Sequence, residues 1–162
     1  MTQQRIIVLM GSKSDLPFAH QIGDFLAKEG FSIKPEYNVA SAHKTPSLLL
    51  NKMKSYEETK DAIVYITVAG LSDALSGIAA GSTKRPVIAC PPDVGKLGWA
   101  KAFSSVMTPK GVSVLFAPSP ENAALAAMKI LALADSSLGN EVKAYMRKKR
   151  EEVIQADKEV TG

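Results

Sequence analysis

A histidine and a lysine stand side by side in the segment 41–45, Ser-Ala-His-Lys-Thr. The cation of Lys44 opposes protonation of the neighbouring imidazole, which keeps His43 available as a neutral base near pH 7. Lys44 itself can pair with a phosphate. Thr45 and Pro46 have the form of a helix start, so the segment is a loop that leads into a helix. A loop histidine can also lack any catalytic role, and that alternative stays open for this segment taken alone.

A second polar segment, 11–15, has the sequence Gly-Ser-Lys-Ser-Asp and follows an apolar run. Gly11 permits a tight turn, and the free amides at the start of a following helix suit a phosphate. The hydroxyls of Ser12 and Ser14 add donors. Asp15 would repel a phosphate but suits a ribose hydroxyl, although Ser14 or Asp15 could instead only cap the helix. The segment has neither the Walker spacing nor the three-glycine dinucleotide fingerprint.

A third polar segment, 69–77, reads Ala-Gly-Leu-Ser-Asp-Ala-Leu-Ser-Gly and follows a buried apolar run. A turn at Gly70 can present bare backbone amides to a flat ring or to a carboxylate, as an oxyanion site does. The alternative is that Ser72 and Asp73 form only a helix cap.

Cysteine chemistry and metal binding are not expected. Cys90 begins a fourth segment, 90–93, Cys-Pro-Pro-Asp, and no second histidine is available to activate it, so we expect a buried thiol. The other histidine, His20, falls opposite the apolar stripe of its helix and is expected to be exposed. No cluster of histidine, cysteine and carboxylate residues has the spacing of metal ligands. A single cysteine makes no internal disulfide, and with no signal peptide in view a cytoplasmic location is expected.

The composition is typical of one globular domain. The chain has 162 residues, of which 46% are hydrophobic and 22% charged, and its formal net charge is +4. No apolar run approaches the roughly 20 residues that a membrane span requires. The basic cluster 147–150 is followed directly by Glu151 and Glu152, which is typical of a solvated helix face. Because only 6% of the residues are aromatic, no nucleic-acid partner is expected either.

Apolar runs alternate with amphipathic stretches, which predicts repeated strand-and-helix units. The expected fold is α/β, a three-layer α/β/α sandwich of flavodoxin-like type with a five-stranded, mostly parallel sheet. Its core spans about residues 4–135 of a single domain, 1–162. An extra C-terminal helix at about 137–159 has a thin apolar stripe, so we expect it to pack on a neighbouring subunit. The five strands are expected at 5–10, 31–39, 62–68, 86–90 and 112–116, with 31–39 near an edge because it contains a proline.

Ligands of an open parallel sheet gather outside the carboxyl ends of its strands, where all four polar segments fall. These segments resemble the phosphoribosylaminoimidazole carboxylase family of purine biosynthesis. The matching pieces are 10–15 (Met-Gly-Ser-Lys-Ser-Asp), 41–45 and the Ala-rich 120–127, and the likeness covers roughly residues 5–150. The family has a mutase branch, which moves a carboxylate from N5 to C4 of the imidazole, and a branch that carboxylates directly with CO2.

The residues favour the direct CO2-using branch. Lys44 stands where the mutases carry arginine, and segment 69–77 replaces a glycine- and alanine-rich segment that contains histidine in the mutases. Segments 69–77 and 88–92 instead look like those of the direct carboxylases. Asp73 departs from that branch, which commonly has asparagine there.

The resemblance implies a role for each segment. Ser12 and Ser14 with Lys44 would hold the 5′-phosphate, and Asp15 the ribose. Ser41 with the 70–72 loop would enclose the base and CO2, and His43 would handle the proton at C4. The resemblance also implies a homo-octamer. The full set of expected substrate-binding residues, beside catalytic His43, is Gly11, Ser12, Ser14, Asp15, Ser41, Ala42, Lys44, Ala69, Gly70, Leu71 and Ser72.

The expected function is carboxylation of 5-aminoimidazole ribonucleotide at C4 with CO2, which yields 4-carboxy-5-aminoimidazole ribonucleotide in de novo purine biosynthesis. The aminoimidazole ring is electron-rich, so C4 can attack CO2 with no cofactor: neither biotin, ATP nor metal is expected. The first alternative is the N5-carboxyaminoimidazole ribonucleotide mutase in the same fold. The second is a non-catalytic flavodoxin-like module that binds a mononucleotide without turnover.

Overall fold

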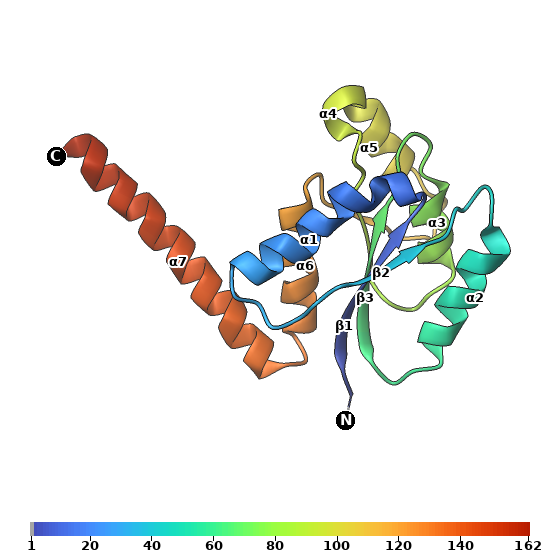
Figure 1. Cartoon of the computed structure of the whole chain (residues 1–162), viewed down its shortest axis with the longest axis horizontal. Helices are drawn as coiled ribbons and strands as arrows, with labels where there is room; N and C mark the ends of the chain where they lie inside the picture. The colour runs from blue at the N-terminus through green and yellow to red at the C-terminus, as the bar shows by residue number, and fades with distance from the viewer. Residues whose placement is uncertain (1) are drawn as a thin grey trace.

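One five-stranded sheet organises the chain. A computed structural model describes residues 2–162, and the strands follow the order β2-β1-β3-β4-β5 with every neighbouring pair parallel (Figure 1). This order is that of flavodoxin-like folds, so the predicted fold class is confirmed and the sheet is wholly parallel. The strands are β1 (Gln4–Met10), β2 (Glu36–Val39), β3 (Ala62–Val68), β4 (Val87–Ala89) and β5 (Leu115–Phe116).

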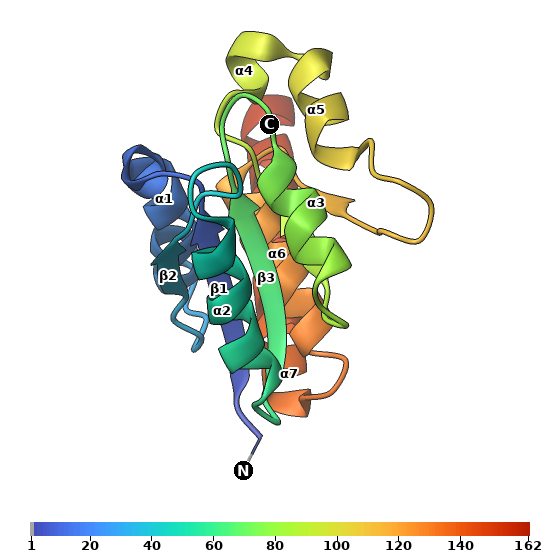
Figure 2. The same cartoon turned by 90° about the vertical axis from the view of Figure 1, so that its right-hand side faces the viewer.

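Helices cover both faces of the sheet (Figure 2). Alternate residues of a strand point to opposite faces, and β1 is apolar at both sets of positions, so each set packs under its own helices. Ile6 and Val8 pack with α1 and α6, whereas Ile7 and Leu9 pack with α2 and α3. The helices are η1 (Lys13–Asp15), α1 (Leu16–Lys28), α2 (Pro46–Glu57), α3 (Ala74–Gly81), α4 (Val94–Leu97), α5 (Trp99–Val106), α6 (Pro120–Leu131) and α7 (Ser136–Thr161).

The strand predicted at 31–39 is shorter than expected. It is an edge strand, as predicted, but its ladder covers only Glu36–Val39. Pro35 lacks an N–H and ends the extended ladder on that side, although Phe31 and Ile33 are still buried in the core.

The chain between β4 and β5 also differs from the prediction. The fifth strand is reduced from 112–116 to Leu115–Phe116, and the helices α4 and α5 were not predicted. Gly98 lies between these two helices with a φ of 55°, a left-handed conformation that glycine adopts at little cost. It separates two short helices in a stretch for which the sequence predicted no element, and both lie beyond the carboxyl ends of the strands (Figure 1).

Helix α7 begins where Asp135 caps it and extends well beyond the body of the fold (Figure 1). Its bounds agree with the predicted 137–159 to within two residues at each end. Leu138 is buried, and Lys148 and Lys149 pair with Glu29 of the α1 C-terminus, whereas residues 151–162 are all exposed. No helix within residues 2–162 combines the length and the apolar character that a membrane crossing needs.

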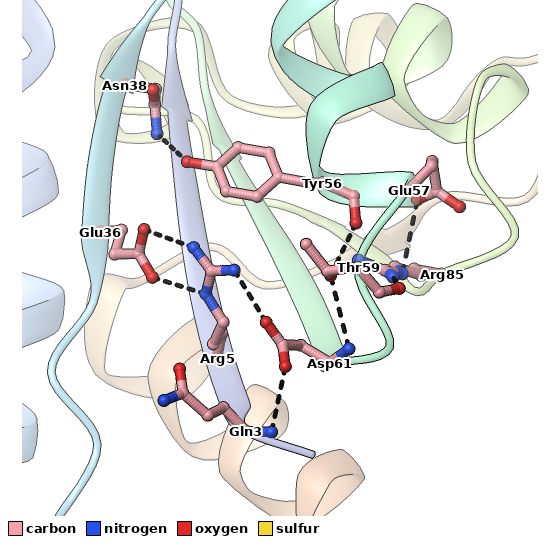
Figure 3. Close-up of polar contacts among 9 residues, drawn as sticks. All are labelled: Gln3, Arg5, Glu36, Asn38, Tyr56, Glu57, Thr59, Asp61 and Arg85. Carbon is pink, nitrogen blue, oxygen red and sulfur yellow. Dashed lines mark hydrogen bonds and ion pairs between the residues drawn. The ribbon is translucent and has the colours of Figure 1, made fainter. Parts of the chain in front are cut away.

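A polar cluster ties the starting ends of three strands together (Figure 3). The Arg5 guanidinium donates two hydrogen bonds to Glu36 at 2.7 and 2.8 Å and one to Asp61 at 2.9 Å. The N–H of Gln3 and the Arg5 guanidinium hold the pKa of Asp61 below its usual range. Since Arg5, Glu36 and Asp61 lie at the starts of β1, β2 and β3, this cluster fixes the sheet at the end opposite the carboxyl ends of the strands.

Candidate active site

A pocket of about 390 Å³ lies at the carboxyl ends of β1, β2, β3 and β4. All twelve residues predicted for the site line it, so the structure brings the three segments 11–15, 41–45 and 69–72 together. The fourth segment also reaches the pocket, although no residue of it was in the predicted set. The lining residues are Gly11, Ser12, Ser14, Asp15, Ser41, Ala42, His43, Lys44, Ala69, Gly70, Leu71, Ser72, Leu75, Pro92 and Asp93.

Three of these lining residues were missed. Pro92 and Asp93 belong to the segment 90–93. Its position at the end of a strand could have indicated that these residues line the pocket, but only Cys90 was considered there. Leu75 lies in the first turn of α3, and apolar periodicity predicts only that it is buried, at 2% exposure.

The turn 11–15 is held by its own side chains. The Ser12 hydroxyl accepts from the Ser14 N–H at 3.3 Å and from the Ser14 hydroxyl at 2.9 Å. The Asp15 carboxylate accepts from the Ser12 N–H at 2.9 Å, which completes a capping box. The alternative of a structural cap is therefore right in part, with Ser12 as the capping residue. Burial is the main cause that raises the pKa of Asp15, and the nearby Asp93 carboxylate raises it further.

The turn 41–45 closes on itself in the same way. The Ser41 carbonyl accepts from the Thr45 N–H at 2.9 Å, the Ser41 N–H donates to the Thr45 hydroxyl at 3.0 Å, and the Ser41 hydroxyl accepts from the Lys44 N–H at 3.1 Å. Ala42 is buried beneath the turn. This arrangement leaves the side chains of His43 and Lys44 exposed at the pocket.

The loop 69–72 adopts a backbone conformation that its sequence did not predict. Leu71 has a φ of 52° and is the one non-glycine residue with positive φ within residues 2–162. Its N–H donates to the Asp93 carboxylate at 2.9 Å, and its carbonyl accepts from the Lys101 ammonium at 2.8 Å. Gly70 leaves room for the Asp93 carboxylate, because a Cβ on residue 70 would lie 2.6 Å from its oxygen and force it to move.

Asp73 caps α3, which gives the departure from the carboxylase branch a structural role. It is 5% exposed, and its carboxylate accepts from the Ser76 N–H at 3.0 Å and from the Ser76 hydroxyl at 2.7 Å. A third donor is the Ser105 hydroxyl of α5, also at 2.7 Å. A buried carboxylate with three donors is stable, and it links the loop 69–72 to α5.

The predictions that Cys90 is a buried thiol and that His20 is exposed agree with the structure. Cys90 is fully buried, and burial raises the pKa of its thiol to about 12, so it is not poised as a nucleophile. His20 is exposed and lies edge-on to the Tyr37 ring. Across residues 2–162, no group of three or more histidine, cysteine and acidic residues could hold a metal ion.

Comparison with known families identifies the family of the chain that carries this site. The family described as AIR carboxylase matches residues 5–152, which is most of the chain. The chain belongs to the AIR carboxylase family. This membership confirms the predicted resemblance. The chain is therefore an enzyme of purine biosynthesis, from a family whose members are carboxylases or mutases.

Some relatives within the AIR carboxylase family are named carboxylases and others mutases. A phosphoribosylaminoimidazole carboxylase from Archaeoglobus fulgidus is 44% identical over 96% of this chain and 84% of its own length. An N5-carboxyaminoimidazole ribonucleotide mutase from Methanocaldococcus jannaschii is 37% identical over 96% of each chain. The crystal structure of Treponema denticola PurE superposes with a TM-score of 0.90 at 37% identity and covers 97% of this chain and 98% of that one.

Substituting Gly70 with alanine should disturb the site more than the fold. The added Cβ displaces the Asp93 carboxylate, and Leu71 N–H loses its acceptor, so we expect the free energy of unfolding to fall by about 1–2 kcal/mol. Binding of aminoimidazole ribonucleotide should weaken at least tenfold. Denaturant unfolding and calorimetric titration measure the two effects.

Gly77→Ala is the matched control. Gly77 lies within α3, where a Cβ meets only the Thr108 methyl at 3.5 Å, so alanine should raise the free energy of unfolding by up to about 1 kcal/mol and leave binding unchanged. Equal affinity of the two alanine variants for the nucleotide would show that Gly70 does not shape the site.

Proposed function

We propose that the chain carboxylates 5-aminoimidazole ribonucleotide at C4 with CO2 to give 4-carboxy-5-aminoimidazole ribonucleotide, with no biotin, ATP or metal. The observation that carries the proposal is the pocket itself, in which the serine turn 11–15 lies beside an exposed histidine and lysine. Overall identity does not separate the two reactions, because carboxylase relatives at 44% and 38% stand near a mutase at 37%. Lys44 and segment 69–77 are what favour direct carboxylation.

The phosphate end of the substrate is assigned to the turn 11–15 and Lys44. The Ser12 and Ser14 hydroxyls are exposed at the pocket, at the start of α1, where helix amides attract an anion. The Lys44 ammonium adds a positive charge at the pocket, whereas Lys13 of the turn does not line it. Asp15 faces the ribose, since one of its oxygens already accepts from Ser12 N–H and the other is left for a hydroxyl.

The reacting carbon is assigned to the space between His43 and the loop 69–72. C4 attacks CO2, the new carbon–carbon bond uses the ring electrons, and one C=O electron pair moves onto the developing carboxylate. The His43 imidazole then takes the C4 proton, which returns the electrons to the ring. Holding dilute CO2 over C4 is the main contribution of the protein, because it converts an encounter of two solutes into a reaction within one complex.

The developing carboxylate is assigned to donors of the loop 69–72. The Leu71 N–H is bonded to Asp93 and is not free for this purpose. The donors that remain in the loop are the amides of Gly70 and Ser72 and the Ser72 hydroxyl. Donors fixed before the reaction stabilise charge that develops during it without further reorganisation.

Supply of CO2 distinguishes direct carboxylation from the two alternatives. The chain is incubated with aminoimidazole ribonucleotide and bicarbonate in the absence of ATP, and the absorbance of the carboxylated product is followed. The rate should increase with the bicarbonate concentration. Turnover of the N5-carboxylated substrate alone would assign the mutase reaction, and tight binding without any turnover would assign the non-catalytic module.

His43→Asn should remove turnover and retain binding. Asparagine keeps a polar side chain of similar reach but cannot accept the C4 proton, so the rate should fall by about 10²–10⁴-fold or more. The affinity for the nucleotide, measured by calorimetric titration, should change little because the phosphate contacts lie elsewhere.

His20→Asn is the control, since His20 is exposed on α1 and does not line the pocket. The assignment of the base is wrong if His43→Asn carboxylates the substrate at a rate close to that of His20→Asn.

The homo-octamer is part of the same proposal, and two exposed apolar strips support it. Val153, Ile154 and Val160 lie on the free part of α7, and Trp99 and Phe103 lie on α5. Such strips on an isolated chain favour contact with further copies. With this assembly we also propose a cytoplasmic location and no nucleic-acid or membrane partner.

The apolar strip of α7 can be tested by its effect on assembly. Light scattering of the unchanged chain should give eight times its 17.3 kDa mass, and Ile154→Asp should lower the mass because a carboxylate would be buried in the contact. If the protein without the substitution is a monomer, or if Ile154→Asp is still an octamer, α7 is not part of an interface.

A further inference from the structure

Lys101 is buried beside the pocket and does not line it. Its side chain belongs to α5, which the sequence did not predict, and it is 1% exposed. A lysine is seldom buried so fully unless its charge is compensated. The compensation comes from three carboxylates: Asp73, Asp93 and Asp15 all act to raise the pKa of Lys101, against the larger lowering effect of its burial.

The hydrogen bond that Lys101 makes is with the strained residue of the site. Its ammonium donates to the Leu71 carbonyl at 2.8 Å, and the Asp93 carboxylate accepts from the Leu71 N–H at 2.9 Å. The left-handed conformation of a non-glycine residue costs about 1–2 kcal/mol. Leu71 gains little from side-chain packing, because it is 75% exposed, so the two charged partners are what hold its backbone.

Two further contacts connect α5 to the same loop. The Asp73 N–H donates to the Ser104 hydroxyl at 2.9 Å, and the Ser105 hydroxyl donates to the Asp73 carboxylate at 2.7 Å. Lys101, Ser104 and Ser105 lie within about one turn of α5. One face of α5 therefore holds both the loop 69–72 and Asp73, which is the N-cap residue of α3.

From these contacts we infer that Lys101 is a positioning residue, which acts through the Leu71 carbonyl to position the loop 69–72 at the reacting carbon of the substrate. It touches neither the phosphate anchor nor His43. Loss of its hydrogen bond lets the Leu71 backbone relax, and the donors of Gly70 and Ser72 then move away from the developing carboxylate. A displacement of about 1 Å can lower a rate by as much as 10²-fold. This inference rests on the proposed function for its effect on rate, but not for its effect on loop order.

The test uses two variants of the full chain. Lys101→Met keeps the length and apolar stem of the side chain, but it leaves three carboxylates with no buried cation and could impair folding. The double variant Lys101→Met/Asp73→Asn removes one charge of each sign, and asparagine can still cap α3, so it should fold. Lys96→Met, an exposed lysine of α4, is the matched control.

In the double variant, kcat for carboxylation should fall at least about tenfold, whereas KM for the nucleotide should change less than about threefold because the phosphate anchor is intact. The kcat and KM of Lys96→Met should match those of the protein without substitutions. Recovery of normal kcat in the double variant would mean that Lys101 only neutralises Asp73, and the inference would be overturned. A rise in KM with unchanged kcat would overturn it as well.

Amide hydrogen exchange of the segment 69–76 provides a second measurement that needs no turnover. Exchange there should accelerate at least about tenfold in the double variant, while β1 and β3 keep their protection. Unchanged exchange would overturn the inference. If the unchanged chain carboxylates nothing, the proposed function fails, and the exchange data still decide whether Lys101 orders the loop.

Discussion

Parallel pairing in one register aligns the carboxyl ends of β1, β2 and β3, and the site depends on this alignment. The last residue of β1, Met10, pairs with Val39 and with Val68, which are the last residues of β2 and β3. The ladder continues one step further through Gly11 N–H to the Val68 carbonyl and Ala40 N–H to the Met10 carbonyl, both at 2.9 Å. Three loops therefore leave the sheet at the same level, and their side chains converge on one pocket. A shift of two residues in the β1–β2 pairing would move His43 by about 7 Å relative to the phosphate anchor, and the same shift in the β1–β3 pairing would move the loop 69–72 by as much.

The two ends of the sheet have different tasks. At the starting ends of the strands, the salt bridges of Arg5 with Glu36 and Asp61 fix the register away from any ligand (Figure 3). At the carboxyl ends, hydrogen bonds within the turns 11–15 and 41–45 fix their backbones and leave the side chains of His43 and Lys44 exposed to a substrate. The loop 69–72 is the exception, because its strained backbone is held by charged groups of β4–α4 and α5. The site thus combines two self-contained turns with one loop that needs support from distant segments.

Much of the fold and the site follows from local patterns of sequence. Buried parallel strands such as Ile6–Leu9 show as continuous apolar runs, and polar residues directly after such runs mark the edge where ligands bind. What local pattern could not predict depends on contacts between distant segments. Lys101 is charged, so periodicity assigns it to the surface, and only the carboxylates of three other loops make its burial stable. The positive φ of Leu71 could not be predicted from the sequence either, since leucine rarely adopts such an angle without charged partners that hold it.

The crystal structure of the chain with aminoimidazole ribonucleotide bound is the most direct test of this account. We predict that the 5′-phosphate contacts the Ser12 and Ser14 hydroxyls and the Lys44 ammonium, with a His43 ring nitrogen about 3–3.5 Å from C4. The ribose hydroxyls should face Asp15, and the space for CO2 should open between C4 and the loop 69–72. A nucleotide bound with its phosphate away from the turn 11–15, or with C4 turned from His43, would contradict it.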